Sequence, residues 1–136
     1  MNYPYLGATL EGGGVRFRVV SPTAEKMAVA LEGGATHPMS KTDEATFETL
    51  VEGVRAGTRY RFVKDGAEMP DPASRFQPEG VHGPSEVVDP NAFNWTDSAW
   101  QGVPHEALVF YELHVGTFTQ EGTYAAAQEK LPYLRE

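Results

Sequence analysis

The segment TRYRFVKDG, residues 58–66, decides how the first part of this 136-residue chain folds. Tyr60 and Phe62 alternate with two arginines, the period-2 pattern of a strand with one face in a core and the other in solvent. The Asp-Gly pair that follows is a strong signal for a two-residue hairpin turn. The segment therefore predicts an antiparallel strand that ends in a tight turn.

Strands of the same kind precede this segment at intervals of roughly ten residues. VRFRV at 15–19 alternates apolar and basic side chains, MAVAL at 27–31 repeats the alternation, and a further strand surrounds Phe47. The three glycines at 12–14 precede a strand rather than a helix, so we expect a hairpin turn there and not a phosphate-binding loop. Short strands separated by polar turns predict an antiparallel β-sandwich over residues 1–90.

The sequence pattern changes after the last of these strands. Residues 69–105 are rich in proline and lack periodicity, apart from a possible short strand at 85–88. A structureless stretch of this length is uncommon unless it wraps or links something. We predict that its first part lies on the sandwich and that residues 91–106 form a linker.

The final third has a different pattern. ALVFYELHVG, residues 107–116, is almost continuously apolar, as in a strand buried on both faces of a parallel sheet. Thr123 can cap the amphipathic helix that follows, and Pro132 should end or kink that helix near its third turn. A (β/α)8 barrel needs about 250 residues, so we expect 107–136 to contain only the first strand and helix of one.

Composition narrows the possible partners. Lys and Arg number 11 against 19 Asp and Glu, a net charge of −8, which disfavours nucleic acid and anionic membranes but not a neutral sugar. The absence of cysteine excludes disulfides and thiolate catalysis. The first residues lack the features of a signal peptide, and no apolar run approaches the ~20 residues of a membrane helix. We expect a cytoplasmic protein.

No group of residues has the spacing of a catalytic or metal site, and we predict no metal, cofactor or catalytic residue in this chain. The four histidines are scattered, and Asp65, Asp71 and Asp89 stand in turns, where carboxylates usually bind backbone amides. His114 is a weak candidate for substrate binding, because active sites form at the C-terminal ends of barrel strands. The alternative is a packed histidine bonded to the neighbouring backbone.

The roles of three aromatic side chains and of Arg75 can also be considered. Phe93, Trp95 and Trp100 could form a sugar platform, but large aromatic residues more often anchor contacts between domains, so we favour a seam between module and barrel. Arg75 is predicted to pin the proline-rich segment through paired hydrogen bonds to a carboxylate or carbonyl.

Several segments together resemble the malto-oligosyltrehalose trehalohydrolases, a branch of the α-amylase superfamily of retaining glycoside hydrolases. RFRVVSP at 16–22 is similar to the opening strand of the family, and RYRF followed by DG is similar to its hairpin. The most specific matches are PDPASR at 70–75 and GVHGPS at 80–85. FYELHVGTFT at 110–119 resembles the first barrel strand of the whole superfamily.

This resemblance implies an immunoglobulin-like module packed against an (α/β)8 catalytic domain. It also implies hydrolysis of the α-1,4 linkage next to the trehalose end of malto-oligosyltrehalose, with release of trehalose. In a retaining mechanism one carboxylate attacks the anomeric carbon and a second carboxyl protonates the leaving oxygen. Both would lie beyond Glu136, so the chain alone should be inactive. Related modules often carry a tryptophan where this chain has Val20, and a valine offers no ring for stacking on sugar.

Other functions remain open. The parent could be a glycogen branching or debranching enzyme, or the chain could be a free-standing α-glucan-binding module. A third possibility is a module that braces the barrel and shapes one wall of the substrate groove. This role is compatible with an N-terminal fragment of a trehalohydrolase. Residues 108–116, without their barrel neighbours, would expose an unpaired edge. We therefore expect this segment to self-associate, exchange with a neighbour or remain disordered.

Overall fold

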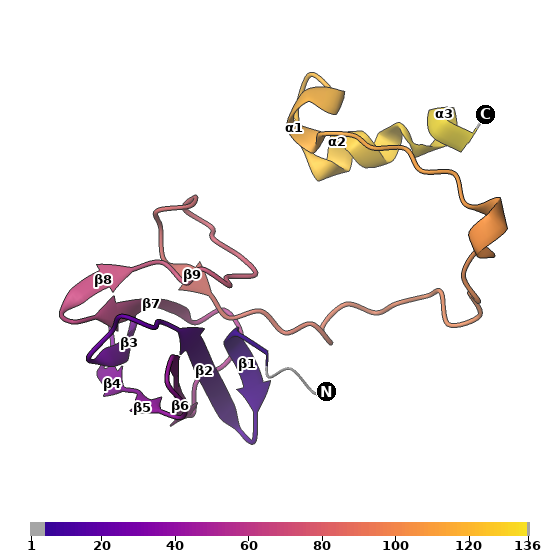
Figure 1. Ribbon diagram of the computed structural model, residues 1–136. Coiled ribbons are helices and arrows are strands. Elements are labelled where there is room, and N and C mark those ends of the chain that lie inside the picture. The colour runs from indigo at the N-terminus through magenta and orange to yellow at the C-terminus, as the bar shows by residue number, and fades with distance from the viewer. Residues whose placement is uncertain (1–4, 136) are drawn as a thin grey trace. The chain divides into compact units, whose positions relative to one another are not determined.

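The computed structural model describes residues 5–135 of the chain. The chain divides into two compact units between Asn94 and Trp95, inside the segment predicted as a linker (Figure 1). The first unit is built from strands and the second from short helices. The two units are described separately below.

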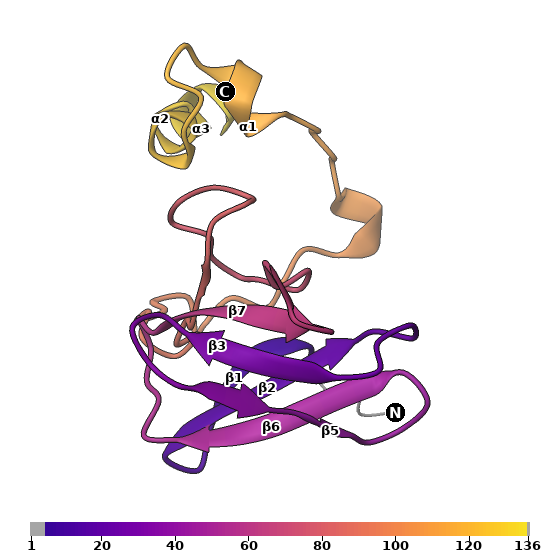
Figure 2. The same ribbon diagram turned by 90° about the vertical axis from the view of Figure 1, so that its left-hand side faces the viewer.

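The first unit contains two antiparallel sheets, which Figure 2 shows as two layers. The strands of the first sheet, in spatial order, are β1 (Gly7–Glu11), β2 (Gly14–Val20), β6 (Thr46–Glu52) and β5 (Ser40–Lys41). Those of the second sheet are β4 (Thr36–Pro38), β3 (Met27–Leu31), β7 (Arg59–Lys64) and β8 (Ala67–Met69), with β9 (Ser85–Glu86) also paired to β7. The predicted class, mainly β with antiparallel sheets, is confirmed.

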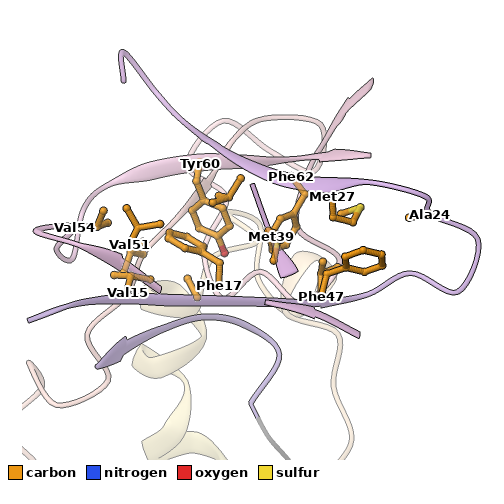
Figure 3. Close-up of a cluster of buried hydrophobic side chains, with 14 residues drawn as sticks. Val15, Phe17, Ala24, Met27, Met39, Phe47, Val51, Val54, Tyr60 and Phe62 are labelled. Atoms are coloured by element: carbon orange, nitrogen blue, oxygen red, sulfur yellow. The ribbon is translucent and has the colours of Figure 1, made fainter. Parts of the chain in front are cut away.

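The core lies between the two sheets (Figure 3). Alternate residues of β2 and β7 point inward, and Val15, Phe17 and Phe62 are fully shielded from solvent. The ring of Phe17 meets the edge of the Tyr60 ring with centroids 4.8 Å apart, a favoured geometry for aromatic pairs. The intervening arginines of both strands lie on the outer faces, so the alternation in sequence becomes two faces in the structure.

Both predicted hairpin turns are present. β1 pairs with β2 across the glycine-rich turn, and β7 pairs with β8 across Asp65 and Gly66. Those two residues have φ values of 49° and 90°, the left-handed backbone that a two-residue hairpin turn requires. The Asp65 carboxylate also accepts hydrogen bonds from the backbone N–H groups of Glu25 and Lys26, at 3.1 and 2.8 Å. The turn thereby ties the end of β7 to the start of β3.

The regular elements described in the second unit are all short helices, and they are joined by irregular segments. It contains a 3-10 turn, η1 (His105–Ala107), and the helices α1 (Val115–Phe118), α2 (Tyr124–Glu129) and α3 (Leu131–Arg135). Thr123 caps α2 as predicted, its hydroxyl accepting a hydrogen bond from the Ala126 N–H at 3.2 Å. The helix is also interrupted shortly before Pro132, since α2 ends at Glu129 and α3 begins at Leu131 with Pro132 as its second residue. No helix of residues 5–135 is long and apolar enough to cross a membrane.

The strand predicted for residues 107–116 is not formed. Ala107 ends η1, residues 108–114 pair with no other strand, and Val115 begins α1. Val109 and Phe110 are 93% and 85% exposed instead of buried. A strand needs a neighbouring strand to satisfy its backbone N–H and C=O groups, and the described part of this unit contains none. The expected βα unit is therefore not seen in this chain.

Candidate functional site

The proline-rich segment is fastened to the sandwich through Asp71. The Tyr60 hydroxyl donates to Asp71 Oδ2 at 2.6 Å, and the two residues are only 2% and 3% exposed. Asp71 Oδ1 accepts from the Ala73 N–H at 2.7 Å, while the Asp71 N–H donates to the hydroxyl of the buried Ser85 at 3.2 Å. These contacts join β7, the start of the segment and β9.

Burial governs the protonation of this pair. It raises the pKa of the Asp71 carboxyl, while hydrogen bonds from Tyr60 and Ala73 and the charge of Arg75 oppose the rise. Burial, and then the Asp71 charge, raise the pKa of Tyr60 well above its ordinary value, so the phenol remains a donor. With both carboxylate oxygens engaged, Asp71 acts as a structural acceptor.

The expectation that the turn carboxylates bind backbone amides is confirmed. Asp65 and Asp71 do so as described, and Asp89 accepts from the Asn91 N–H at 2.9 Å. Arg75 also pins the segment as predicted, but by one hydrogen bond of 2.6 Å to the Ala8 carbonyl instead of a pair. Ala8 lies on β1, the edge strand of the first sheet, so this bond joins the proline-rich segment to that edge.

The outer arginines of β7 hold the loop between β8 and β9. Arg59 Nη1 donates to Glu79 at 2.7 Å, and Arg61 Nη2 donates to the His82 carbonyl at 3.0 Å. A cavity of about 340 Å³ lies beside this loop, and we name it the β7 cavity. Its lining residues are Ala30, Leu31, Glu32, Gly33, Tyr60, Arg61, Glu68, Glu79 and Pro84. Four of these are charged, namely Glu32, Arg61, Glu68 and Glu79, which makes the cavity strongly polar.

A second cavity, of about 330 Å³, lies along β1, and we name it the β1 cavity. It is lined by Tyr5, Ala8, Thr9, Leu10, Arg75, Val88, Pro90 and Asn91. No sequence pattern indicates this cavity, because its residues come from three separate segments with no shared spacing. A tyrosine, a threonine and an asparagine are too common in loops and edge strands to signal a site before the fold brings them together.

Val20 lies at the end of β2 and is 46% exposed, so this position is accessible but aliphatic. Phe93, Trp95 and Trp100 are 66%, 69% and 68% exposed. Their assignment to a seam with a barrel stays a prediction. No group of three or more His, Asp or Glu side chains that could hold a metal occurs among residues 5–135.

His114 precedes α1 and is exposed. Its carbonyl accepts hydrogen bonds from the N–H groups of Thr117 and Phe118, both at 3.0 Å. Its ring Nδ1 lies 3.4 Å from the Thr117 hydroxyl. A Cβ at Gly116 would stand 2.9 Å from the imidazole Cε1, so glycine lets the ring lie against the helix backbone. These contacts are local to α1 and bring His114 to no other candidate residue.

The sandwich and its attached loop define the class of protein. Residues 5–92 match the model of carbohydrate-binding module 48, the isoamylase N-terminal domain, and the chain belongs to that family. Within it, the chain is 53% identical over 133 residues to a malto-oligosyltrehalose trehalohydrolase of Deinococcus radiodurans and 43% identical over 131 residues to that of Saccharolobus solfataricus. Each match includes 96% of this chain but only 22% and 23% of the respective relative.

A solved structure agrees with these matches. A protein from Salmonella typhimurium assigned as an alpha amylase superimposes with a TM-score of 0.85 at 44% identity, over 95% of this chain and 22% of that protein. The similarity thus extends through both units of this chain, and the chain spans less than a quarter of each of these three proteins.

Proposed function

We propose that this chain is the N-terminal part of a glycoside hydrolase that cleaves malto-oligosyltrehalose at the α-1,4 linkage next to its trehalose end. The supporting observation is the 53% identity to a trehalohydrolase over 96% of the chain. By analogy with retaining enzymes of this class, catalysis needs a carboxylate nucleophile and a carboxyl acid about 5–5.5 Å apart. Asp71, a buried carboxyl of the described residues, has both oxygens engaged in hydrogen bonds, so we do not assign it a catalytic role.

The proposal also assigns a fold to each part of the chain. The sandwich is an immunoglobulin-like module, and residues 107–116 become the first strand of a (β/α)8 barrel when parallel neighbours are present. The composition of this segment supports the assignment, because apolar side chains on both faces suit a strand inside a parallel sheet. Thr123 already caps the helix that would follow that strand. His114 would then stand at the carboxyl end of the strand, where it could line the floor of the sugar site.

The module itself braces the barrel and forms one wall of the groove for the α-glucan. The valine at position 20, which offers no ring for stacking on sugar, supports a bracing role over strong independent binding of starch. The decisive test is an assay of the full-length protein. Release of trehalose from malto-oligosyltrehalose supports the proposal, and chain transfer on amylose would instead identify a branching enzyme.

A matched variant tests the role of His114. His114→Ala in the full-length enzyme should raise KM if the ring lines the sugar site, while His114→Gln should restore part of the affinity. Unchanged kinetics and unchanged thermal stability in both variants would remove His114 from the site.

A further inference from the structure

β1 is the longest edge strand in the part of the chain that the structure describes. It has five residues and pairs with β2 on one side only (Figure 1). The other edge strands, β4, β5, β8 and β9, have two or three residues each, and β4 includes Pro38, which has no backbone N–H. Short strands and proline hinder pairing of a sheet with another molecule, so those edges are blunted. β1 has neither feature and needs another form of protection.

The backbone groups on the free side of β1 belong to Ala8 and Leu10. In an antiparallel pair, alternate residues exchange hydrogen bonds with the partner strand, and the residues between them direct their N–H and C=O groups to the other side. Arg75 Nη1 donates to the Ala8 carbonyl at 2.6 Å, which places that carbonyl at the free edge. Leu10, two residues further along the strand, faces the same way by this alternation. A second strand would need the groups of both residues.

Residues 71–75 occupy the free edge at Ala8, and we name them the edge guard. Its last member, Arg75, binds the Ala8 carbonyl. The Ala8 N–H interacts with the hydroxyl oxygen of Tyr60. Side chains therefore engage both backbone groups of Ala8, in the place of a neighbouring strand.

The backbone of the edge guard also packs against the start of β1. A Cβ on Gly7 would lie 2.9 Å from Asp71 Oδ2 and 3.0 Å from the Ala73 carbonyl oxygen, so only glycine leaves room for this contact. The buried Tyr60 hydroxyl holds the same Asp71 oxygen at 2.6 Å. The edge guard is thus anchored in the core of the sandwich, and all of its contacts lie within the first unit.

We propose that the edge guard prevents β1 from pairing with β1 of a second copy of this chain. With Ala8 engaged, Leu10 is the one outward residue left on the strand, and a single residue offers too few hydrogen bonds to hold a second strand. Without the guard, Ala8 and Leu10 would present adjacent free N–H and C=O groups, the start of an antiparallel ladder. Two identical antiparallel strands are self-complementary across a two-fold axis, which makes a second copy the fitting partner. The inference concerns the sandwich alone and does not rest on the proposed enzymatic function.

The test uses the 136-residue chain with Val109→Lys, a change expected to suppress association through residues 108–116. Arg75→Met removes the donor but keeps the aliphatic stem of the side chain. In this background it should tighten self-association roughly tenfold in analytical ultracentrifugation, about what one added hydrogen bond gives. Arg75→Lys retains a donor and should restore most of the original behaviour.

Arg61→Met is the matched control, because Arg61 also donates to a loop carbonyl, that of His82 at 3.0 Å, but lies on the second sheet. It should leave self-association unchanged. Gly7→Ala is a second route to the same effect, since its Cβ would displace the edge guard without altering Arg75, and it should also tighten association. Hydrogen exchange locates the contact, because the Leu10 amide of Arg75→Met should become more protected as the protein concentration rises.

Tighter association of Arg75→Met and Gly7→Ala, with added protection at Leu10, supports the edge guard. Association without added protection at Leu10, or equal association of the Arg61→Met control, would overturn it. A monomer that stays folded by circular dichroism in both edge-guard variants would overturn it as well. If one of these two variants does not fold, the other decides by the same criteria.

Discussion

The hydroxyl of Tyr60 lies 2.6 Å from Oδ2 of Asp71, and both residues are almost completely buried. Tyr60 belongs to a central strand of the second sheet, and Asp71 opens the segment that returns across the sandwich to β9. This hydrogen bond therefore joins Tyr60, whose ring lies in the core, to the proline-rich segment that begins near Asp71. The first predictions concern this bond.

Tyr60→Phe should lower the free energy of unfolding by about 1–3 kcal/mol, because it keeps the ring but leaves a buried carboxylate short of a donor. Urea denaturation measures the change. Tyr124→Phe, at an exposed position, should change stability by less than about 0.5 kcal/mol. A loss in Tyr60→Phe no larger than in this control would show that Asp71 finds an equivalent partner.

The pH dependence of stability should report the buried Asp71 carboxyl. Its pKa in the folded chain is raised above the ordinary value of 3.8, so the folded state holds the proton more tightly than the unfolded state. The contribution of Asp71 to stability is then complete below that ordinary value and is lost as the pH rises through the folded-state pKa. The stability of the parent minus that of Asp71→Asn, followed by urea denaturation from pH 3.5 to 7, should fall as the pH rises.

The comparison with Asp71→Asn is needed because other carboxyl groups have lowered pKa values and change the stability with pH in the opposite direction. Arg16 lowers the pKa of Glu11, and backbone N–H groups of Ala45 and Thr46 lower that of Asp43. Those groups stabilise the fold above their unfolded pKa values and lose that effect as the pH falls. A difference between parent and variant that grows with pH would mean that Asp71 is more acidic in the folded chain than burial predicts.

Gly7→Ala should disturb the same region from the side of β1. The backbone φ of Gly7 is +83°, and a Cβ there would lie 2.9 Å from Asp71 Oδ2 and 3.0 Å from the Ala73 carbonyl oxygen. Gly12→Ala is the matched control, since its φ is +57° but a Cβ would meet nothing within 4 Å. Both variants lose about 1–2 kcal/mol from the left-handed backbone, and Gly7→Ala should lose measurably more by thermal denaturation. Equal losses would show that the segment around Asp71 shifts freely.

The 136-residue chain should self-associate through residues 108–116, because exposed apolar side chains and an unpaired backbone favour pairing with another chain. Light scattering should show a molar mass that increases with concentration. Val109→Lys should suppress the increase, whereas Tyr133→Lys on α3, which is 72% exposed, should not. A constant monomeric mass across the concentration range, with signals from an ordered 108–116 segment, would rule this out.

Much of the sandwich could be predicted from local pattern. The alternation around Tyr60 and Phe62, the Asp65-Gly66 turn and the Thr123 cap each depend on a few consecutive residues, whose backbone geometry and side-chain period act locally. The strand expected at 107–116 is not formed in this chain, because an apolar run indicates that a strand is favourable but does not supply its partners. The β1 cavity could not be predicted, since Tyr5, Thr9 and Asn91 meet only after β1 and the returning segment have folded.

By itself, the amino-acid sequence determined which stretches are strands with one buried face, where they turn and which family the PDPASR and GVHGPS segments resemble. Only the tertiary structure decided that β2 pairs with β6 across the intervening strands, that Tyr60 meets Asp71, and that the groups around Thr9 enclose a cavity. The physical reason is distance along the chain. Side-chain periodicity and turn geometry depend on neighbouring residues, whereas pairing and enclosure depend on which distant surfaces are buried together.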